Sequence, residues 1–339
     1  MALSKAFEKR NVLVTGGAGF IGSHLCERLI HENAQVICID NFMNSKPINI
    51  EHILGIEDFV FINADITQPL ELEKYRELER FNVKFQGIQE IYHLACPTSV
   101  KRFEEFKIQT LRANSDGVRN VLDLAVKNEA KIVFGSSCVV YGPRSYSKFK
   151  FSETDLGAVD QLSNRACYDE GKKFAETMCA TYSDVFRLDV RIARIFRTYG
   201  PRMMVADGQM INDFIAAALK GEDVIINGKK DFKSSLTFVT DVVDGLIKLM
   251  QAPKGTGAVN LGTEYEYLVE EVAQKIIQRM GSKSRIRFED PLPFLSELGI
   301  PDLTKAKDVM GWFPLTTIDE GLKQTIDYTI ANQGRLGIV

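Results

Sequence analysis

The fold of this chain is decided by a glycine-rich turn, Gly16-Gly17-Ala18-Gly19-Phe20-Ile21-Gly22. The short apolar run from Val12 to Val14 precedes the turn, and apolar residues at helical spacing follow it from Phe20 to His31. A second apolar run from Val36 to Ile39 completes a strand, a helix and a strand. Glycines at G-x-x-G-x-x-G spacing permit a tight turn and let backbone N–H groups approach a pyrophosphate at the start of the helix. The pattern therefore predicts a dinucleotide-binding βαβ unit.

Asp40 stands at the end of the second predicted strand. A carboxylate there accepts hydrogen bonds from the ribose hydroxyls of an adenosine and repels a 2′-phosphate, so it favours NAD over NADP. A glycine-rich turn with a capping aspartate gives the same local pattern without a ligand. The strand, turn, helix and acid together favour the cofactor site over that alternative.

Buried apolar runs and helical patterns alternate after this unit. The runs lie at 59–62, 91–94, 132–134 and 190–195, and the helical patterns include 110–127 and 168–184. This alternation is typical of a parallel sheet that is covered by helices on both faces. We therefore expect an α/β fold, a Rossmann-type doubly wound parallel sheet.

The character of the sequence changes after Phe196, where prolines and glycines separate short helical stretches. We expect a smaller, mostly helical C-terminal substrate domain there, and apolar runs at Leu236–Val239 and Ala258–Leu261 are expected to return to the first domain. The predicted NAD-binding domain comprises residues 1–196 plus about 236–262. The predicted substrate domain comprises about 197–235 plus 263–339.

Composition excludes several classes of protein. Lys and Arg number 42 against 45 Asp and Glu, a net charge of −3, so nucleic acid is not an expected partner. No stretch approaches the ~18 apolar residues that span a bilayer, so no membrane is expected. The 6 cysteines form no C-x-x-C pair and lack further ligands at zinc spacing, which predicts reduced thiols, no metal and a cytoplasmic location.

Three polar side chains are candidates for catalysis. Tyr168 and Lys172 are four residues apart in a helical pattern, so they share a face, and a cation beside a phenol lowers the pKa of that phenol. Ser137 follows a predicted strand, at the sheet edge where open α/β proteins bind ligands, although a lone serine there is more often a turn residue. Cys138 is predicted to be a small buried residue and His93 a structural one.

These motifs together resemble the extended short-chain dehydrogenases/reductases of the NAD-dependent sugar epimerase/dehydratase family. The resemblance covers essentially the whole chain. It is carried by Thr15–Gly22, Asp40-Asn41-Phe42, His93-Leu94-Ala95, Ser136-Ser137, Tyr141-Gly142, Tyr168–Lys172 and Gly200-Pro201-Arg202. Within the family, the segments Ala193–Phe196, Gly200–Met203, Pro301–Lys307 and Gly311-Trp312 look most like UDP-glucuronate decarboxylases.

The resemblance implies a reaction at C4 of a nucleotide sugar, most simply a UDP-sugar. Ser137 and Tyr168 would hold the C4 hydroxyl, Tyr168 would take its proton, and Lys172 would bind the nicotinamide ribose and keep Tyr168 acidic. A transient 4-ketone would then allow a neighbouring carboxylate to leave as CO₂. The implied cofactor contacts are Gly16, Gly19, Phe20, Ile21, Asp40, Asn41, Asn44, Ser45, Asp65, Ile66, Leu94, Ala95, Tyr168 and Lys172, and the implied substrate contacts are Thr98, Ser137, Arg197 and Arg202.

The chain departs from the decarboxylase pattern in its substrate wall. Val139 stands where a glutamate is usual, Arg197 replaces an asparagine, and Ser234 replaces an arginine. Arginines expected at Gln209 and just before Pro301 are also absent. The valine cannot protonate a departing hydroxyl, which disfavours 4,6-dehydration, whereas decarboxylation and 4-epimerisation need only the ketone. Two readings of Arg197 remain open: it binds phosphate in place of the lost arginine, or it is a solvated loop residue.

We therefore expect an NAD-dependent enzyme that resembles a UDP-glucuronate decarboxylase, with a nucleotide-sugar 4-epimerase as the alternative. A non-catalytic NAD-binding regulator is the alternative of another class. Retention of Ser137, Tyr168 and Lys172 favours an enzyme, because a binding module has less use for an acidic phenol. The resemblance also implies a homodimer that pairs the helices beginning near Thr110 and Arg165.

Overall fold

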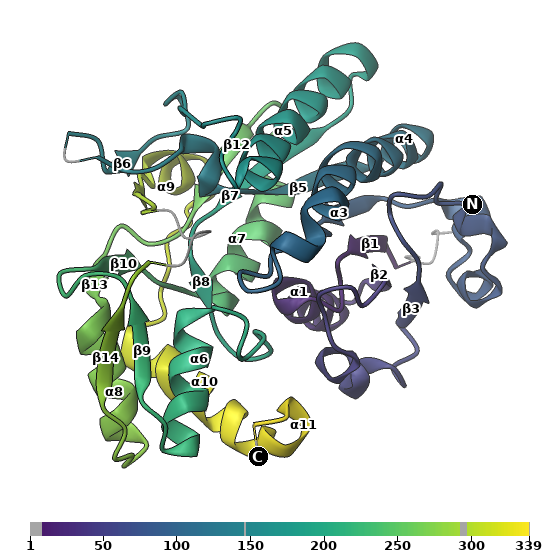
Figure 1. Cartoon of the computed structure of the whole chain (residues 1–339). Helices are drawn as coiled ribbons and strands as arrows, with labels where there is room; N and C mark the ends of the chain where they lie inside the picture. Colours follow the sequence, from purple (N-terminus) through teal and green to yellow (C-terminus); the bar gives the residue numbers. More distant parts are fainter. Residues whose placement is uncertain (1–8, 146, 292–296, 339) are drawn as a thin grey trace.

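The structure, a computed structural model, describes residues 9–145, 147–291 and 297–338. Its centre is a 7-stranded parallel sheet with the strand order β12-β7-β5-β4-β1-β2-β3 (Figure 1). The strands are β1 (Asn11–Thr15), β2 (Gln35–Asp40), β3 (Phe59–Asn63), β4 (Glu90–His93), β5 (Lys131–Ser137), β7 (Val190–Ile195) and β12 (Gly257–Leu261). Each strand pairs in parallel with its neighbours, which confirms the Rossmann-type α/β prediction.

The strand order reverses at β1, which lies between β2 and β4. From β1 the sheet continues to β2 and β3 on one side and to β4, β5, β7 and β12 on the other. The connections on the two sides therefore diverge and leave a crevice at the carboxyl ends of β1 and β4. The predicted glycine-rich turn and the residues after β4 therefore meet at one edge of the sheet.

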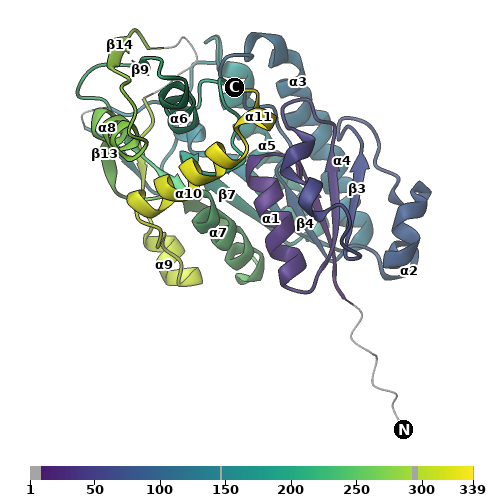
Figure 2. The same cartoon turned by 90° about the horizontal axis from the view of Figure 1, so that it is seen from below.

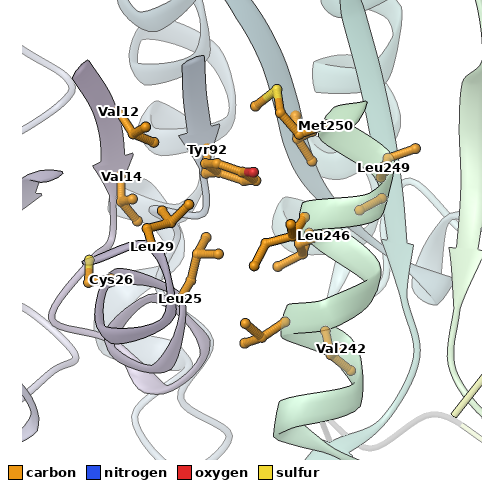
Figure 3. Close-up of a cluster of buried hydrophobic side chains, with 14 of the residues drawn as sticks. Val12, Val14, Leu25, Cys26, Leu29, Tyr92, Val242, Leu246, Leu249 and Met250 are labelled. Atoms are coloured by element: carbon orange, nitrogen blue, oxygen red, sulfur yellow. The ribbon is translucent and has the colours of Figure 1, made fainter. Parts of the chain in front are cut away.

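One face of the sheet is covered by α1 (Phe20–His31) and α7 (Val239–Gln251). Figure 3 shows Leu25 and Leu29 of α1 facing Val242 and Leu246 of α7, with Tyr92 of β4 beside them. All of these side chains are at most 1% exposed. The apolar spacing along each helix directs one stripe onto the sheet, which buries the apolar strand residues from water.

The other face is covered by α4 (Val118–Asn128) and α5 (Ala166–Phe186), with α3 (Lys107–Arg112) beside them (Figure 1). The single helix expected over 110–127 is instead two helices joined by one π-helical turn, Ala113–Gly117. Asn114 in this turn is buried and its amide donates to the Thr110 carbonyl at 2.9 Å. The spacing of apolar residues in the sequence does not reveal that one turn of the helix contains an extra residue.

A second, smaller part gathers α6 (Met210–Lys220), α8 (Val269–Arg279) and α10 (Ile318–Ala331) around their own buried cluster. Figure 2 shows α6 and α8 at the opposite end of the molecule from β3, with α10 extending from that end toward the middle. The run Leu236–Val239 does not join the main sheet, because β11 (Thr237–Phe238) pairs with β8 (Thr198–Tyr199) outside it. The chain comes back through α7 to β12, directly beside β7.

The remaining elements are short. The strands are β6 (Lys150–Phe151), β9 (Val224–Asn227), β10 (Lys233–Ser235), β13 (Glu266–Leu268), β14 (Ile286–Glu289) and β15 (Ile300–Pro301). The helices are α2 (Val83–Gln86), α9 (Thr304–Met310), α11 (Gln333–Leu336) and the 3-10 turns Pro47–Asn49, Glu51–Ile53, Leu72–Lys74, Arg76–Phe81, Glu104–Phe106 and Cys138–Tyr141. Within the described ranges, no helix has both the length and the apolarity to cross a membrane. Residues 1–8 of the predicted first domain lie outside these ranges.

Candidate active site

A cleft with a volume of ≈ 390 Å³ opens at the carboxyl ends of the central strands. Its walls come from the turn after β1, the loops after β2, β3 and β4, the end of β5, the start of α5 and the segment after β7. Every residue predicted to touch cofactor or substrate lines this cleft: Gly16, Gly19, Phe20, Ile21, Asp40, Asn41, Asn44, Ser45, Asp65, Ile66, Leu94, Ala95, Thr98, Ser137, Tyr168, Lys172, Arg197 and Arg202.

The glycine-rich turn is packed so closely that side chains cannot enter it. Gly16 has a φ of +72°, and its N–H donates to the Ile39 carbonyl at 2.8 Å, which ties the turn to the end of β2. A Cβ at Gly22 would lie 2.1 Å from the Gly16 carbonyl oxygen. Because the glycines remove these side chains, the first turn of α1 presents its backbone N–H groups to the cleft, as pyrophosphate binding requires.

Asp40 is held in place by several donors from its own loop and from the glycine-rich turn. Its Oδ1 accepts from Phe42 N–H at 2.9 Å and from the Ser45 hydroxyl at 2.8 Å, and its Oδ2 accepts from Ala18 N–H at 3.1 Å. Burial raises the pKa of Asp40, and these hydrogen bonds oppose that rise. The carboxylate lines the cleft, where it is placed to accept from a ribose hydroxyl.

The predicted catalytic residues meet where β5 ends and α5 begins. Ser137 is the last residue of β5 and forms a hydrogen bond with Tyr168 of α5. Lys172 is 3% exposed, donates to the Gly135 carbonyl at 2.8 Å, and has its Nζ 5.9 Å from the centre of the Tyr168 ring. The helical spacing of four residues therefore does place the phenol and the ammonium group on one side of α5, next to the serine.

The pKa of Tyr168 runs against the sequence expectation. Burial raises it well above the ordinary value, the nearby Cys96 thiol raises it further, and the hydrogen bond with Ser137 and the charge of Arg165 lower it. The expected acidifying effect of Lys172 does not offset the burial, because the Lys172 ammonium group is directed to the Gly135 carbonyl. Phenol acidity at this position depends on what further charge enters the cleft.

His93 and Cys138 match their predicted structural roles. His93 is 1% exposed and its Nδ1 lies 2.7 Å from the Thr15 hydroxyl, and burial together with the charge of Lys172 lowers its pKa to about 3. Cys138 is buried, which raises the pKa of its thiol to about 11. A neutral imidazole and a protonated thiol are the stable forms, so neither group supplies a charged catalyst near neutral pH.

The two predicted substrate arginines differ in their partners. Arg202 donates to the Glu27 carboxylate of α1 at 2.6 Å and has a φ of +67°. Arg197 follows β7, and its buried Nε has no hydrogen-bond partner among the described residues. Arg202 is thus held through its Nη2, while its buried Nη1 has no partner among the described residues, and Arg197 has no side-chain hydrogen bond to any of them.

Comparison with known proteins assigns this architecture to a family. Residues 12–262 match the NAD dependent epimerase/dehydratase family. The chain belongs to this family. It is 38% identical over 322 residues to UDP-glucuronic acid decarboxylase 1 of Xenopus tropicalis, an alignment that covers 95% of this chain and 72% of that protein. It is 36% identical to UDP-glucuronic acid decarboxylase 6 of Arabidopsis thaliana, over 94% of this chain and 89% of that protein.

A solved structure of a family member has the same fold. UDP-glucose 4-epimerase of Thermotoga maritima, crystallised with UDP-glucose, superposes with a TM-score of 0.83 at 26% identity, covering 95% of this chain and 99% of that one. The sequence resemblance to the epimerase/dehydratase family is therefore confirmed.

NAD is the cofactor of the epimerase/dehydratase family, and the cleft fits it. Asn44 lines the cleft with its Oδ1 buried and unpaired within the described ranges, so this oxygen can accept a bond from a ribose hydroxyl beside Asp40. The cradle around Gly16 and Gly22 has no room for a Cβ at either position. Both observations agree with a dinucleotide laid along the start of α1.

The structure places the residues at which the sequence analysis expects departures from the decarboxylase pattern. Val139 is 3% exposed and lines the cleft directly after Cys138, so the wall is apolar at this position. Ser234 is buried, its hydroxyl donates to the Ser235 carbonyl at 3.2 Å, and it does not line the cleft. The sequence analysis missed Arg165, whose guanidinium lies 5.3 Å from the centre of the Tyr168 ring. Its position three residues before Tyr168, at the start of a helix, was the available signal.

Proposed function

We propose that this chain oxidises C4 of a UDP-sugar with bound NAD, and that its reaction is the decarboxylation of UDP-glucuronate. The observation that supports an enzyme is the meeting of Ser137, Tyr168 and Lys172 in the cleft beside the dinucleotide turn. The substrate is proposed from the curated relatives, which are UDP-glucuronic acid decarboxylases at 36% and 38% identity over nearly the whole chain.

The residues divide the work of the oxidation. The Ser137 hydroxyl, hydrogen-bonded to Tyr168, positions the C4 hydroxyl of the sugar against the phenol, and Tyr168 accepts its proton. Lys172 would bind the nicotinamide ribose and, once drawn toward it, favour the phenolate. NAD, when bound, supplies the hydride acceptor and later the hydride donor. Reduction of the ketone closes the cycle, so the cofactor is not consumed.

A UDP-sugar 4-epimerase is the second candidate. Val139 gives the wall beside Ser137 no acid, and both epimerisation and decarboxylation need only the 4-ketone. The structural relative from Thermotoga maritima is a UDP-glucose 4-epimerase at 26% identity. The two reactions differ in whether C5 keeps its carboxylate.

The experiment is a panel incubation of the purified protein with UDP-glucuronate, UDP-glucose and UDP-N-acetylglucosamine. NADH absorbance, released CO₂ and product mass are followed together, with Tyr168→Phe as the control that keeps the ring and removes the hydroxyl. CO₂ from UDP-glucuronate supports the decarboxylase, and a product of unchanged mass but altered configuration supports the epimerase. Absence of any product with every sugar, while NAD stays bound, would establish the non-catalytic regulator instead.

We also propose a homodimer built on α3 and α5. These helices contact each other and expose large apolar side chains: Ile108 is 66% exposed, Leu111 45% and Phe174 53%. Exposure of such an apolar patch to water is unfavourable. A second copy that pairs the same two helices buries the patch symmetrically. Sedimentation at micromolar concentration should give a dimer, and Leu111→Arg should shift it to monomer. A wild-type monomer would contradict the proposal.

A cytoplasmic location is proposed from the thiols. All 6 cysteines are free in the structure, and none of the described elements depends on a disulfide. Proteins with several unpaired cysteines are typical of reducing compartments.

A further inference from the structure

Arg197 lies at the reacting end of the cleft. Ile195, two residues before it, is the register partner of Ser137 across the β5–β7 pair. The Arg197 carbonyl accepts from Thr237 N–H at 3.0 Å, which fixes its backbone against β11. The side chain lines the cleft together with Cys138 and Tyr168. Arg197 is therefore placed beside the expected position of the sugar ring. Asp40, where the adenosine is expected, lies on a different wall of the cleft.

The other basic side chains of the cleft are already engaged. Arg112 pairs with Asp116 at 3.6 Å, Arg165 with Asp169 at 2.9 Å and Arg202 with Glu27 at 2.6 Å, while Lys172 donates to the Gly135 carbonyl at 2.8 Å. Arg197 forms no ion pair or side-chain hydrogen bond within the described ranges, and its Nε is buried. Among the cleft-lining cations of that part of the chain, its guanidinium is the one without a protein partner.

Among the described residues, the surroundings of Arg197 supply no anionic side chain that acts on it. The charged and titratable groups that act on it are the Cys138 thiol from the end of β5 and the Arg165 guanidinium from the start of α5. Burial and the like charge of Arg165 lower the pKa of Arg197, and Cys138, itself protonated, offers only weak compensation. A buried cation without an anion is costly, so the position is built for an anionic ligand group.

We propose that Arg197 binds the carboxylate on C5 of a UDP-hexuronate and slows its loss as CO₂ after C4 has been oxidised. This inference rests on the step that the proposed decarboxylation and its 4-epimerase alternative share, the oxidation of C4, and in a decarboxylase the pairing limits the rate of CO₂ loss without preventing it. Of the anionic groups on such a substrate, the C5 carboxylate is the one attached next to C4, and Arg197 lies beside the residues that act on C4. The planar guanidinium matches a carboxylate with two parallel hydrogen bonds.

The chemistry gives the pairing a direction. In decarboxylation the C5–C6 bond breaks, its electron pair forms the C4–C5 enolate, C6 leaves as neutral CO₂, and a proton is later added at C5. The negative charge therefore moves from the carboxylate to the C4 oxygen. A guanidinium paired with the carboxylate stabilises the starting ketone more than the departing CO₂ and raises the barrier. Return of the hydride to C4, which keeps the carboxylate, is not opposed.

Binding is measured first, on NAD-loaded protein that carries Tyr168→Phe, so that no turnover consumes the ligand. UDP, UDP-glucose and UDP-glucuronate are titrated calorimetrically into this background and into its Arg197→Met and Arg197→Lys derivatives. Arg197→Met should weaken UDP-glucuronate at least ~30-fold and change UDP and UDP-glucose by less than about twofold. Arg197→Lys keeps the positive charge but not the planar pair of donors, so its affinity for UDP-glucuronate should lie between those of the parent protein and Arg197→Met. Arg279→Met, a matched change on α8 outside the cleft, should alter none of the three.

Two outcomes overturn the assignment of the carboxylate. An equal loss for all three ligands would place the guanidinium on the diphosphate, and no loss for any would make Arg197 a loop residue. Misfolding would not imitate the expected result, because replacing an unpaired buried cation by a neutral chain of similar length should raise the melting temperature of the ligand-free protein.

The product ratio tests the second half of the proposal. With Tyr168 restored and UDP-glucuronate saturating, Arg197→Met should release more CO₂ per C4-epimerised product than wild type. An unchanged or lower ratio would refute the restraining role. If wild type forms neither product, the proposed function fails, whereas the selective loss of UDP-glucuronate affinity would still report the carboxylate site.

Discussion

Gly22 offers the sharpest test of how the dinucleotide turn is built. Glycine-to-alanine changes inside helices normally stabilise a protein by up to ~1 kcal/mol, and Gly22 lies in the first turn of α1. Here the added Cβ would lie 2.1 Å from the Gly16 carbonyl oxygen, 2.8 Å from Gly17 Cα and 2.9 Å from the Gly16 carbonyl carbon. Ordinary contacts are about 3.5 Å, so the turn and the helix must separate by more than about 1 Å.

All three atoms belong to the backbone, so no side-chain rotation relieves the overlap. Overpacking costs ~1 to 3 kcal/mol, and an overlap of 2.1 Å with backbone belongs at the upper end, so after a helix-propensity gain of up to ~1 kcal/mol Gly22→Ala should lose about 2 kcal/mol of stability. Because the displaced N–H groups are those expected to meet the pyrophosphate, NAD affinity should fall at least ~10-fold as well. Urea unfolding with and without NAD, together with calorimetric titration of NAD, measures both effects.

Gly55→Ala is the matched control. A Cβ at Gly55 has no atom within 4 Å, and the backbone there is not left-handed, so the change should be neutral or stabilise the fold by up to ~1 kcal/mol. If Gly22→Ala unfolds at the same urea concentration as wild type and binds NAD as tightly, the inference that the turn is too closely packed to accept a side chain at Gly22 is refuted.

Further changes follow from the site. Asp40→Asn should weaken NAD and narrow its preference over NADP, because the acceptor for the ribose hydroxyls is lost; an unchanged ratio of the two affinities would count against the assignment. Tyr168→Phe should lower turnover ~10²- to 10⁴-fold with NAD binding intact, and a smaller loss on an identified substrate would argue for another base. His24 and His93 have pKa values lowered to about 4 and about 3 by burial, below the unfolded value of 6.5. Both are neutral in the fold, so stability is present above pH 6.5 and should fall as the pH drops toward 4, at about 1.4 kcal/mol per unit of pKa difference; a melting temperature that is flat over this window would refute it.

The sequence predicts the local units of the fold well and their partners less well. The helix Phe20–His31 and the strand Val190–Ile195 match the structure, because apolar spacing is a property of contiguous residues. The apolar run at 236–239 pairs outside the main sheet, which the sequence could not show, since an apolar run indicates that a strand is buried and not which strand it pairs with. The π turn at 113–117 is set by the burial of Asn114, which no period in the sequence marks.

The same limit applies to the site. Motif spacing brought all predicted residues to one cleft, but it did not reveal that Arg202 is paired with Glu27 across 175 residues of chain. It predicted the neighbourhood of Tyr168 and Lys172, yet burial decides the pKa of the phenol, and burial is a property of the assembled cleft.

The return of the chain to β12, directly beside β7, has a consequence for how such a protein can diversify. The excursion that carries Arg197 and β8 leaves and re-enters the sheet at neighbouring strands, which lie ~4.8 Å apart in a sheet. Closing a loop whose ends are already anchored costs only ~0.6 kcal/mol more each time its length doubles. Insertions and exchanges in the part of this excursion before α7 can therefore accumulate while the cofactor scaffold, which α7 helps to bury, stays unaltered. This topology should therefore tolerate replacement of the segment that carries Arg197 and β8 by the corresponding segment of a relative.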